Sequence, residues 1–310
     1  MNDILQILPA TIKEMVQNLP EEMKNNVEEI RLRIDRPLEV IAYGKPYYPL
    51  VKNERYIVTK EDGRFFLNQL SQYSLYAFEE ELKQGYITVR GGHRVGLAGR
   101  VIMENGKVKG IREISSYNIR IARQKIGIAA KLIPHIYENG WQNTLIIGPP
   151  QSGKTTLLRD IARMISEGVK EKNIPPQKVG IVDERSEIAA SVRGIPQHSL
   201  GDRVDVLDGC PKAEGMMMMI RSMSPDVIIV DEIGRPEDAQ AVKEALCAGV
   251  KIVTTVHGFD FEDVANRPTV KDLLLYEAFS RTVELTRKDG FVGIVKKIRH
   301  HGQKDVVRIV

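Results

Sequence analysis

The chain has 310 residues, of which 42% are hydrophobic and 28% are charged, and its formal net charge is +4. No apolar run reaches the roughly 18 residues that a membrane-spanning helix needs, and the N-terminus lacks the basic stretch and apolar core of a secretory leader. We therefore expect a globular protein that stays in the cytoplasm and has no transmembrane segment of its own. Because the mild positive charge forms no stripe of Lys and Arg between aromatic residues, no nucleic acid partner is expected.

The first part of the chain mixes helical and strand patterns. Helical spacing covers residues 11–18, 21–26, 61–69 and 75–84, and alternating apolar residues predict strands at 29–34, 38–42, 86–90 and 94–103. Asn105-Gly106 is typical of a tight hairpin turn after the last strand. Two domains are the natural expectation for 310 residues. We therefore expect a smaller α+β N-terminal domain over residues 1–125 and a larger domain over residues 126–310.

The second domain has the alternation of strands and helices that is typical of an α/β fold with a parallel sheet. Short apolar runs, rich in β-branched residues, predict buried strands at residues 144–147, 179–182, 227–230 and 251–256. Ligands bind beyond the carboxyl ends of such strands, so the residues that follow each run are candidates for one shared site. Further along, the alternating segments 291–298 and 306–310 predict a hairpin around His301-Gly302.

The first apolar run leads into a phosphate-binding loop. Residues 148–155, Gly-Pro-Pro-Gln-Ser-Gly-Lys-Thr, match the pattern G-x-x-x-x-G-K-[ST], and apolar residues at helical spacing follow them. Lys154 is expected to bind the β- and γ-phosphates of ATP, and the hydroxyl of Thr155 to hold Mg²⁺. The residues expected to contact ATP are Gly148, Pro150, Gln151, Ser152, Gly153, Lys154, Thr155 and Thr156.

Two carboxylates, Asp231 and Glu232, directly follow the run at residues 227–230. In a parallel sheet this position lies beside the phosphate-binding loop. Asp231 is suited to hold Mg²⁺ through a water molecule, together with Thr155. Glu232 is suited to orient or deprotonate the water that attacks the γ-phosphate. The sequence therefore predicts hydrolysis of ATP as well as binding.

The other two runs also end in polar residues, Asp183-Glu184 after one and His257 after the other. In the same crevice Glu184 is a second candidate for the water-positioning acid. His257 is a candidate sensor of the γ-phosphate. Which of Asp183, Glu184 and Glu232 positions the water is left open by the residues alone.

The sulfur-containing residues predict structure rather than chemistry. Cys210 and Cys247 are far apart and fit no metal-binding or redox spacing, so we expect reduced thiols. Cys247 is expected to be buried on a helix over residues 239–248. The four methionines at residues 216–219 are expected to pack against the sheet, because methionine fills irregular cores well.

The order of these motifs resembles that of the secretion/pilus ring ATPases, and residues 223–240 are similar to the Walker B stretch of that superfamily. In its first half, residues 85–100 and 115–123 resemble the stage III sporulation protein AA family of endospore-forming bacteria. The resemblance spans nearly the whole chain. The chain differs from the secretion ATPases in carrying Asp231-Glu232 where they usually carry Gly-Glu, and in the order of Asp183-Glu184.

The resemblance implies a RecA-like P-loop ATPase core and a homo-hexameric ring that hydrolyses ATP with Mg²⁺. It implies a motor in the mother cell, peripheral to the mother cell–forespore membrane through integral-membrane subunits of a secretion-like sporulation channel complex. In the related ring ATPases, arginines of the N-terminal domain contact the nucleotide phosphates. Here Arg94 and Arg120 are the candidates for that role, because a cation from a neighbouring subunit stabilises the charge that develops on the γ-phosphate.

Two alternative functions stay open at this point. One is a RecA-like ATPase that depends on nucleic acid, which stimulation of turnover by DNA or RNA would favour. The other is a nucleotide-binding scaffold with little turnover, which tight ATP binding without phosphate release would favour.

Overall fold

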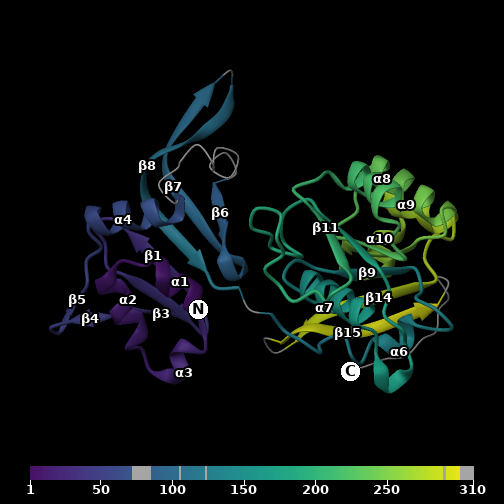
Figure 1. Ribbon diagram of the computed structural model, residues 1–310, viewed down its shortest axis with the longest axis horizontal. Helices are drawn as coiled ribbons and strands as arrows, with labels where there is room; N and C mark the ends of the chain where they lie inside the picture. The colour runs from purple at the N-terminus through teal and green to yellow at the C-terminus, as the bar shows by residue number, and fades with distance from the viewer. Residues whose placement is uncertain (72–84, 105, 123, 289–290, 301–310) are drawn as a thin grey trace. The chain divides into compact units, whose positions relative to one another are not determined.

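The computed structural model describes residues 1–71, 85–104, 106–122, 124–288 and 291–300. The chain divides into two compact units, Met1–Arg123 and Gln124–Val310 (Figure 1). Within the residues that the structure describes, the first has one hydrophobic core and the second has two. The units are called here the N-terminal unit and the C-terminal unit. Among the described residues, no helix is both long and apolar enough to cross a membrane.

The N-terminal unit is an α+β structure built on a six-stranded sheet with the strand order β3-β2-β1-β8-β7-β6. All neighbouring strands in this sheet are antiparallel. Its strands are β1 (Val27–Arg33), β2 (Glu39–Ala42), β3 (Lys45–Tyr47), β6 (Tyr86–Val89), β7 (His93–Glu104) and β8 (Lys107–Arg120), with a separate ribbon of β4 (Leu50–Val51) and β5 (Glu54–Arg55). Among its described residues, the helices are α1 (Asn2–Ile7), α2 (Ala10–Gln17), α3 (Glu21–Lys24) and α4 (Lys60–Ser71).

One apolar core joins the helices of this unit to its sheet. Ile12 of α2 and Phe66 of α4 are fully buried together with Ile30 of β1 and Ile119 of β8. Strands β7 and β8 form a long hairpin that extends beyond the rest of the sheet (Figure 1). The structure confirms the helices and strands predicted for this unit, except that the helix predicted at residues 75–84 and Asn105 lie outside the described residues.

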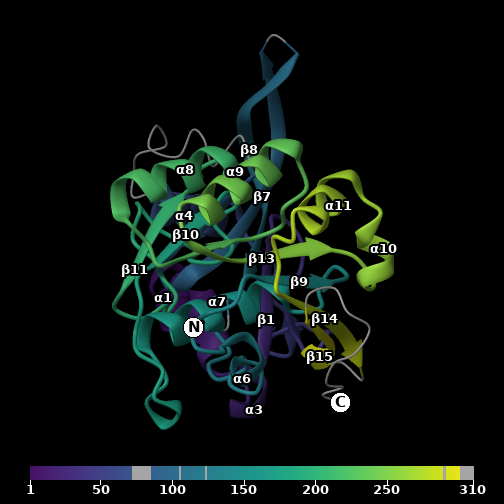
Figure 2. The ribbon, with the colours of Figure 1, turned by 90° about the vertical axis from the view of Figure 1, so that its right-hand side faces the viewer.

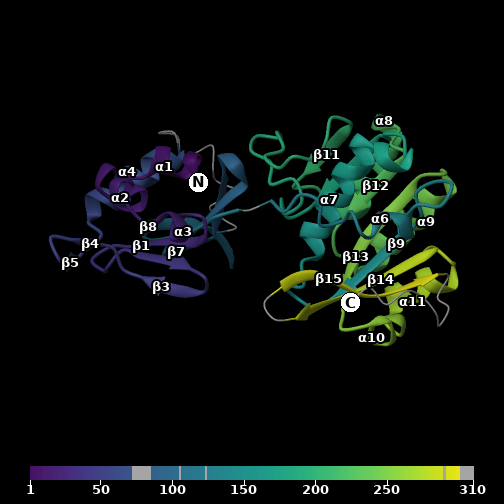
Figure 3. The same cartoon turned by 90° about the horizontal axis from the view of Figure 1, so that it is seen from below.

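The C-terminal unit is an α/β structure with a seven-stranded sheet in the order β11-β10-β12-β13-β9-β14-β15. The strands are β9 (Thr144–Gly148), β10 (Val179–Asp183), β11 (Val204–Asp208), β12 (Val227–Val230), β13 (Lys251–His257), β14 (Arg281–Lys288) and β15 (Phe291–His300). Neighbouring strands from β11 to β14 are parallel, and β15 is antiparallel to β14 (Figure 3). The helices are α6 (Ile133–Ile136), α7 (Lys154–Glu167), α8 (Lys212–Met223), α9 (Pro236–Cys247), α10 (Phe261–Ala265) and α11 (Pro268–Leu275).

Helices cover both faces of this sheet, which explains why its central strands are apolar without interruption. Helix α7 lies on one face and packs on residues such as Ile146 of β9. Helices α8, α9 and α11 lie on the other face and pack on residues such as Leu145 and Ile228 (Figure 2). Successive side chains of a strand point to opposite faces, so Leu145 and Ile146 enter different cores.

Two details differ from the expectations, and one prediction is not tested. Strand β15 forms at the predicted place and pairs with β14, whereas residues 306–310, its predicted hairpin partner, lie outside the described residues. Cys247 is exposed rather than buried, because it is the last residue of α9, where its Sγ lies 3.3 Å from the hydroxyl of Tyr276. Of the four methionines, Met216 and Met219 are buried against the sheet, whereas Met218 faces solvent.

Candidate nucleotide-binding site

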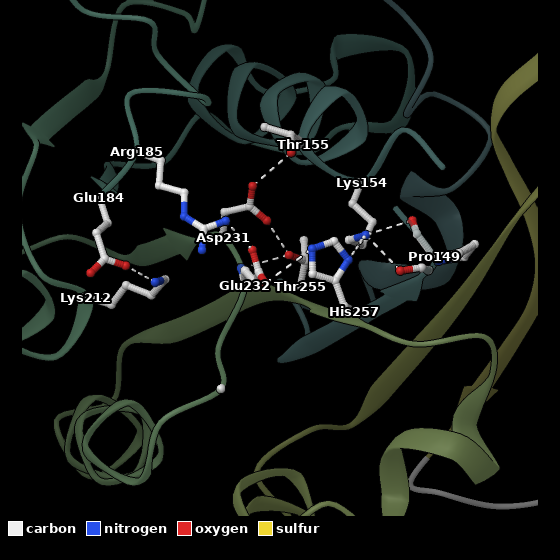
Figure 4. A network of polar contacts seen from close by, with 12 residues as sticks. Pro149, Lys154, Thr155, Glu184, Arg185, Lys212, Asp231, Glu232, Thr255 and His257 are labelled. Carbon is white, nitrogen blue, oxygen red and sulfur yellow. Dashed lines mark hydrogen bonds and ion pairs between the residues drawn. The ribbon is translucent and has the colours of Figure 1, made fainter. Parts of the chain in front are cut away.

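Four neighbouring strands bring the predicted site residues to one edge of the sheet. Strands β10, β12, β13 and β9 lie side by side and are parallel, so their carboxyl ends meet. The residues at these ends include Asp183, Asp231, His257 and Gly148, with His257 directly opposite Gly148 in the register. Figure 4 shows the resulting network of side chains from the loop, from β12 and from β13.

The loop between β9 and α7 is tightly folded, and glycine is required at its first position. A Cβ atom on Gly148 would lie 2.4 Å from Oγ of Ser152. Gln151 and Gly153 have φ angles of 61° and 89°, so the backbone turns sharply before α7 begins at Lys154. Pro150 lies in this turn, and Thr156 lies in the first turn of the helix. The loop thus places backbone N–H groups at the N-terminus of α7, where the helix dipole favours anions.

The side chain of Lys154 is held by the loop itself. Its ammonium group donates hydrogen bonds to the carbonyl oxygens of Gly148 at 2.7 Å and Pro149 at 3.0 Å. Nδ1 of His257 lies 2.9 Å from the same nitrogen. Lys154 is only 6% exposed, and burial lowers its pKa, while the nearby charges of Asp231 and Glu232 act in the opposite direction.

The expected metal ligands are in direct contact. The hydroxyl of Thr155 donates a hydrogen bond of 2.8 Å to Oδ2 of Asp231. The hydroxyl of Thr255 donates to the other oxygen of Asp231 and accepts a hydrogen bond of 2.9 Å from the backbone N–H of Glu232. Thr255 therefore orients both acids of the Walker B strand. Thr255 is not among the predicted site residues, although it lies two residues before His257 at the end of the same apolar run.

Both carboxylate oxygens of Glu232 have basic neighbours. A guanidinium nitrogen of Arg185 donates to Oε2 at 2.8 Å, and Nε2 of His257 lies 3.2 Å from Oε1. Glu232 has a φ angle of 50°, which is unusual for a residue with a side chain. This backbone conformation and two basic neighbours fix the carboxylate at the end of β12.

The two acids at the end of β10, Asp183 and Glu184, have different environments. Asp183 is buried, and its carboxylate accepts hydrogen bonds from the backbone N–H groups of Glu187, Ile188 and Ala189 at 2.8–2.9 Å. Burial raises its pKa to about 6, while these hydrogen bonds lower it. The carboxylate oxygens of Asp183 thus stabilise the turn after β10. Glu184 forms an ion pair with Lys212 of α8 and lines a cavity next to Glu232.

The residues at this edge fit a bound triphosphate. Oγ of Ser152 is buried inside the loop and has no hydrogen-bond partner among the described residues, so it can donate to a phosphate oxygen. Lys154 can exchange loop carbonyls for phosphate oxygens, and the oxygens of Thr155 and Asp231 are of the kind that Mg²⁺ prefers. A cavity of about 310 Å³ continues from Glu232 between Arg185, Arg235 and Arg267.

Arg94 and Arg120 lie on β7 and β8 of the N-terminal unit, directly opposite each other in the antiparallel register. The guanidinium group of Arg94 lies 4.2 Å from the centre of the Tyr86 ring. Their action on a nucleotide stays a prediction.

The fold and sequence of the chain resemble those of secretion and pilus ATPases. The structure matches that of the pilus retraction motor PilT with bound ADP at a TM-score of 0.56 and 17% identity, over 91% of this chain and 77% of that one. This likeness confirms the predicted fold, a RecA-like P-loop ATPase core that follows an α+β N-terminal part. The chain is also 23% identical to the type II secretion system protein E of Aeromonas hydrophila, over 81% of its own length and 46% of that protein.

A closer relationship covers the whole chain. It is 58% identical to the stage III sporulation protein AA of Bacillus subtilis (strain 168), over 94% of this chain and 92% of that protein. The family model "Sporulation stage III, protein AA" matches residues 1–305. The predicted family is therefore confirmed: the chain belongs to the stage III sporulation protein AA family, which is related to the secretion ATPases.

Proposed function

We propose that this protein is a Mg²⁺-dependent ATPase that hydrolyses ATP to ADP and phosphate. The observation that carries the proposal is the meeting of Lys154, the Thr155–Asp231 pair and Glu232 at one edge of the sheet. A phosphate-binding lysine, two oxygen ligands for Mg²⁺ and a carboxylate for water are the parts that phosphoryl transfer to water requires.

Each residue has a distinct task in this proposal. Lys154 gives up its loop carbonyls for the β- and γ-phosphates, which lie at the N-terminus of α7. Thr155 and Asp231 hold Mg²⁺, which, when bound, neutralises charge on the phosphates. Glu232 orients the attacking water and accepts its proton, and His257 links the carboxylate to Lys154. Glu184, paired with Lys212, is kept as the alternative water-positioning acid.

We further propose that the protein acts as a homo-hexameric ring motor with an N-terminal domain at residues 1–125 and an ATPase domain at residues 126–310. Arg94 and Arg120 would then reach the nucleotide of a neighbouring subunit. The names of the relatives support a motor of a secretion-like machine in sporulation. We place it in the cytoplasm of the mother cell, where integral-membrane subunits of a sporulation channel complex would hold it at the mother cell–forespore membrane.

Phosphate release by the purified protein tests this function. We expect turnover with Mg²⁺ and none with excess EDTA. Lys154→Ala should keep its fold, since the hydrogen-bond partners of the lysine are the loop carbonyls and His257 rather than the apolar cores, but should lose turnover. Wild-type activity in this variant would contradict the assignment of the site.

Two further measurements test the rest of the proposal. Stimulation of turnover by DNA or RNA would favour the nucleic-acid-dependent alternative. Particle images with and without ATP would test the ring.

A further inference from the structure

Arg185, the residue after Glu184, holds the carboxylate that is proposed to position water. Its guanidinium group lies 2.8 Å from Oε2 of Glu232. It also lines the small cavity next to Asp183 and Asp231 as well as the larger cavity of about 310 Å³. A cation is thus bound to the candidate catalytic base, next to the expected Mg²⁺ ligand and within the same chain.

Of the two basic neighbours of Glu232, Arg185 is the one that is always positively charged. An ammonium group has three protons and no lone pair, and Lys154 has three acceptors around it: two carbonyl oxygens and Nδ1 of His257. Nδ1 is therefore the acceptor opposite a protonated Lys154. The other ring nitrogen, Nε2, lies 3.2 Å from Oε1 of Glu232. Arg185 faces it across the carboxylate as a full positive charge.

The backbone around Arg185 is fixed while its side chain reaches into solvent. Before it, Asp183 binds three backbone N–H groups and Glu184 is paired with Lys212. After it, the hydroxyl of Ser186 donates to Asp208 at 2.6 Å. The side chain of Arg185 itself is 61% exposed. An ion pair this exposed contributes little free energy, so exchanging one anion for another costs little.

We propose that Arg185 is a phosphate-contacting catalytic residue supplied by the same chain as the phosphate-binding loop. The proposal rests on the ATPase function given above. Without nucleotide, Arg185 holds Glu232; with ATP, its guanidinium group moves to the γ-phosphate, whose oxygens match its donors bidentately. This movement leaves Glu232 next to His257 and with the lone pairs of Oε2 open to water. The exchange makes the water-positioning carboxylate available only when a γ-phosphate is present.

Nucleotide binding by Arg185→Ala tests the proposal without relying on turnover. We expect the variant to bind fluorescent ADP within about twofold of the wild-type affinity, because ADP has no γ-phosphate. A non-hydrolysable ATP analogue with Mg²⁺ should bind about tenfold more weakly, since a charge-assisted contact is lost. ATP turnover should fall by roughly 10³-fold or more, as for other arginines that contact the transferred phosphate. Arg185→Lys keeps the charge but not the planar pair of donors, and should recover only part of both losses.

Arg221→Ala is the matched control, because Arg221 is an exposed arginine of α8 and lines neither of the two cavities beside Glu232. It removes the same charge and should leave the ratio of analogue to ADP affinity unchanged. If Arg185→Ala keeps the wild-type ratio and turnover, Arg185 does not contact the γ-phosphate, while a loss of turnover in Lys154→Ala still supports the ATPase function. If the wild-type protein releases no phosphate, the ATPase function fails, and the affinity ratio alone decides the role of Arg185.

Discussion

The ammonium nitrogen of Lys154 lies 2.9 Å from Nδ1 of His257, so β13 and the phosphate-binding loop share a hydrogen bond across the nucleotide site. The other ring nitrogen of His257 lies 3.2 Å from Glu232. In the proposed complex, in which Lys154 binds phosphate instead, Nδ1 loses its donor while Nε2 keeps its contact with the carboxylate. His257 therefore connects the lysine proposed to bind the phosphates to the acid proposed to position water.

Replacing His257 should separate these two events. His257→Ala is expected to bind ATP, because the loop is intact, but to hydrolyse it roughly 10²-fold more slowly, because Glu232 loses a positioning contact. His257→Gln carries both a donor and an acceptor and should retain more activity than His257→Ala. Steady-state phosphate release and nucleotide titration would measure the two effects. Wild-type turnover in His257→Ala would show that the histidine only packs.

The two candidate acids can be compared by isosteric changes. Glu232→Gln keeps the shape of the side chain but cannot accept a proton, so ATP should bind and remain unhydrolysed. Glu184→Gln should weaken only the contact with Lys212 and keep most of the turnover. Single-turnover measurements with radiolabelled ATP would distinguish binding from chemistry. The reverse result, with Glu184→Gln inactive and Glu232→Gln active, would assign the water to Glu184.

Sequence reasoning succeeded where local pattern determines structure. Unbroken apolar runs identified the buried strands β9, β10, β12 and β13, since residues covered on both faces leave no room for polar alternation. It missed β11 and β14, which alternate polar and apolar residues and lie nearer the edges of the sheet. These two segments form strands mainly because they pair with a neighbouring strand, and less because of their amino-acid composition.

Within the site, contacts between distant segments were beyond prediction. The pairing of Arg185 with Glu232 exists because β10 is next to β12, and strand order is not encoded in either segment alone. Asp183 was weighed as a catalytic acid, but the turn that follows folds back and supplies its backbone donors. No local sequence pattern predicts that turn.

A buried histidine in the N-terminal unit should make its stability depend on pH. Nδ1 of His93 accepts a hydrogen bond of 2.9 Å from the backbone N–H of Ala122, and the side chain is 3% exposed. Burial lowers the pKa of His93 to about 4 from 6.5. The folded unit therefore favours the neutral ring, and its stabilisation is complete above pH 6.5 and is lost as the pH falls towards 4. The loss should approach about 3 kcal/mol.

His93→Asn tests this pH dependence. Oδ1 of Asn can accept the same hydrogen bond from Ala122, but the amide does not titrate. Hydrogen exchange of peptides around residues 93–97 and 117–122 would compare the two proteins between pH 7 and pH 4.5. We expect protection in the wild type to fall towards low pH relative to the variant. Parallel curves for both proteins would show that His93 does not control the stability of this unit.

The last prediction concerns the ring. If Arg94 or Arg120 reaches the nucleotide of a neighbouring subunit, each variant to Ala should bind ATP normally, because the phosphate-binding loop is intact, yet hydrolyse it poorly. Mixing such a variant with Lys154→Ala should restore part of the activity, since mixed rings contain interfaces with an intact loop opposite an intact arginine. The recovery should increase with protein concentration, as expected for a site that forms only on association.

Two outcomes would contradict this prediction. If the two defects do not complement in samples where mixed oligomers are seen, the arginine acts within its own chain. Full activity of both single arginine variants would instead leave Arg94 beside Tyr86 and Arg120 on β8 as structural residues of the sheet.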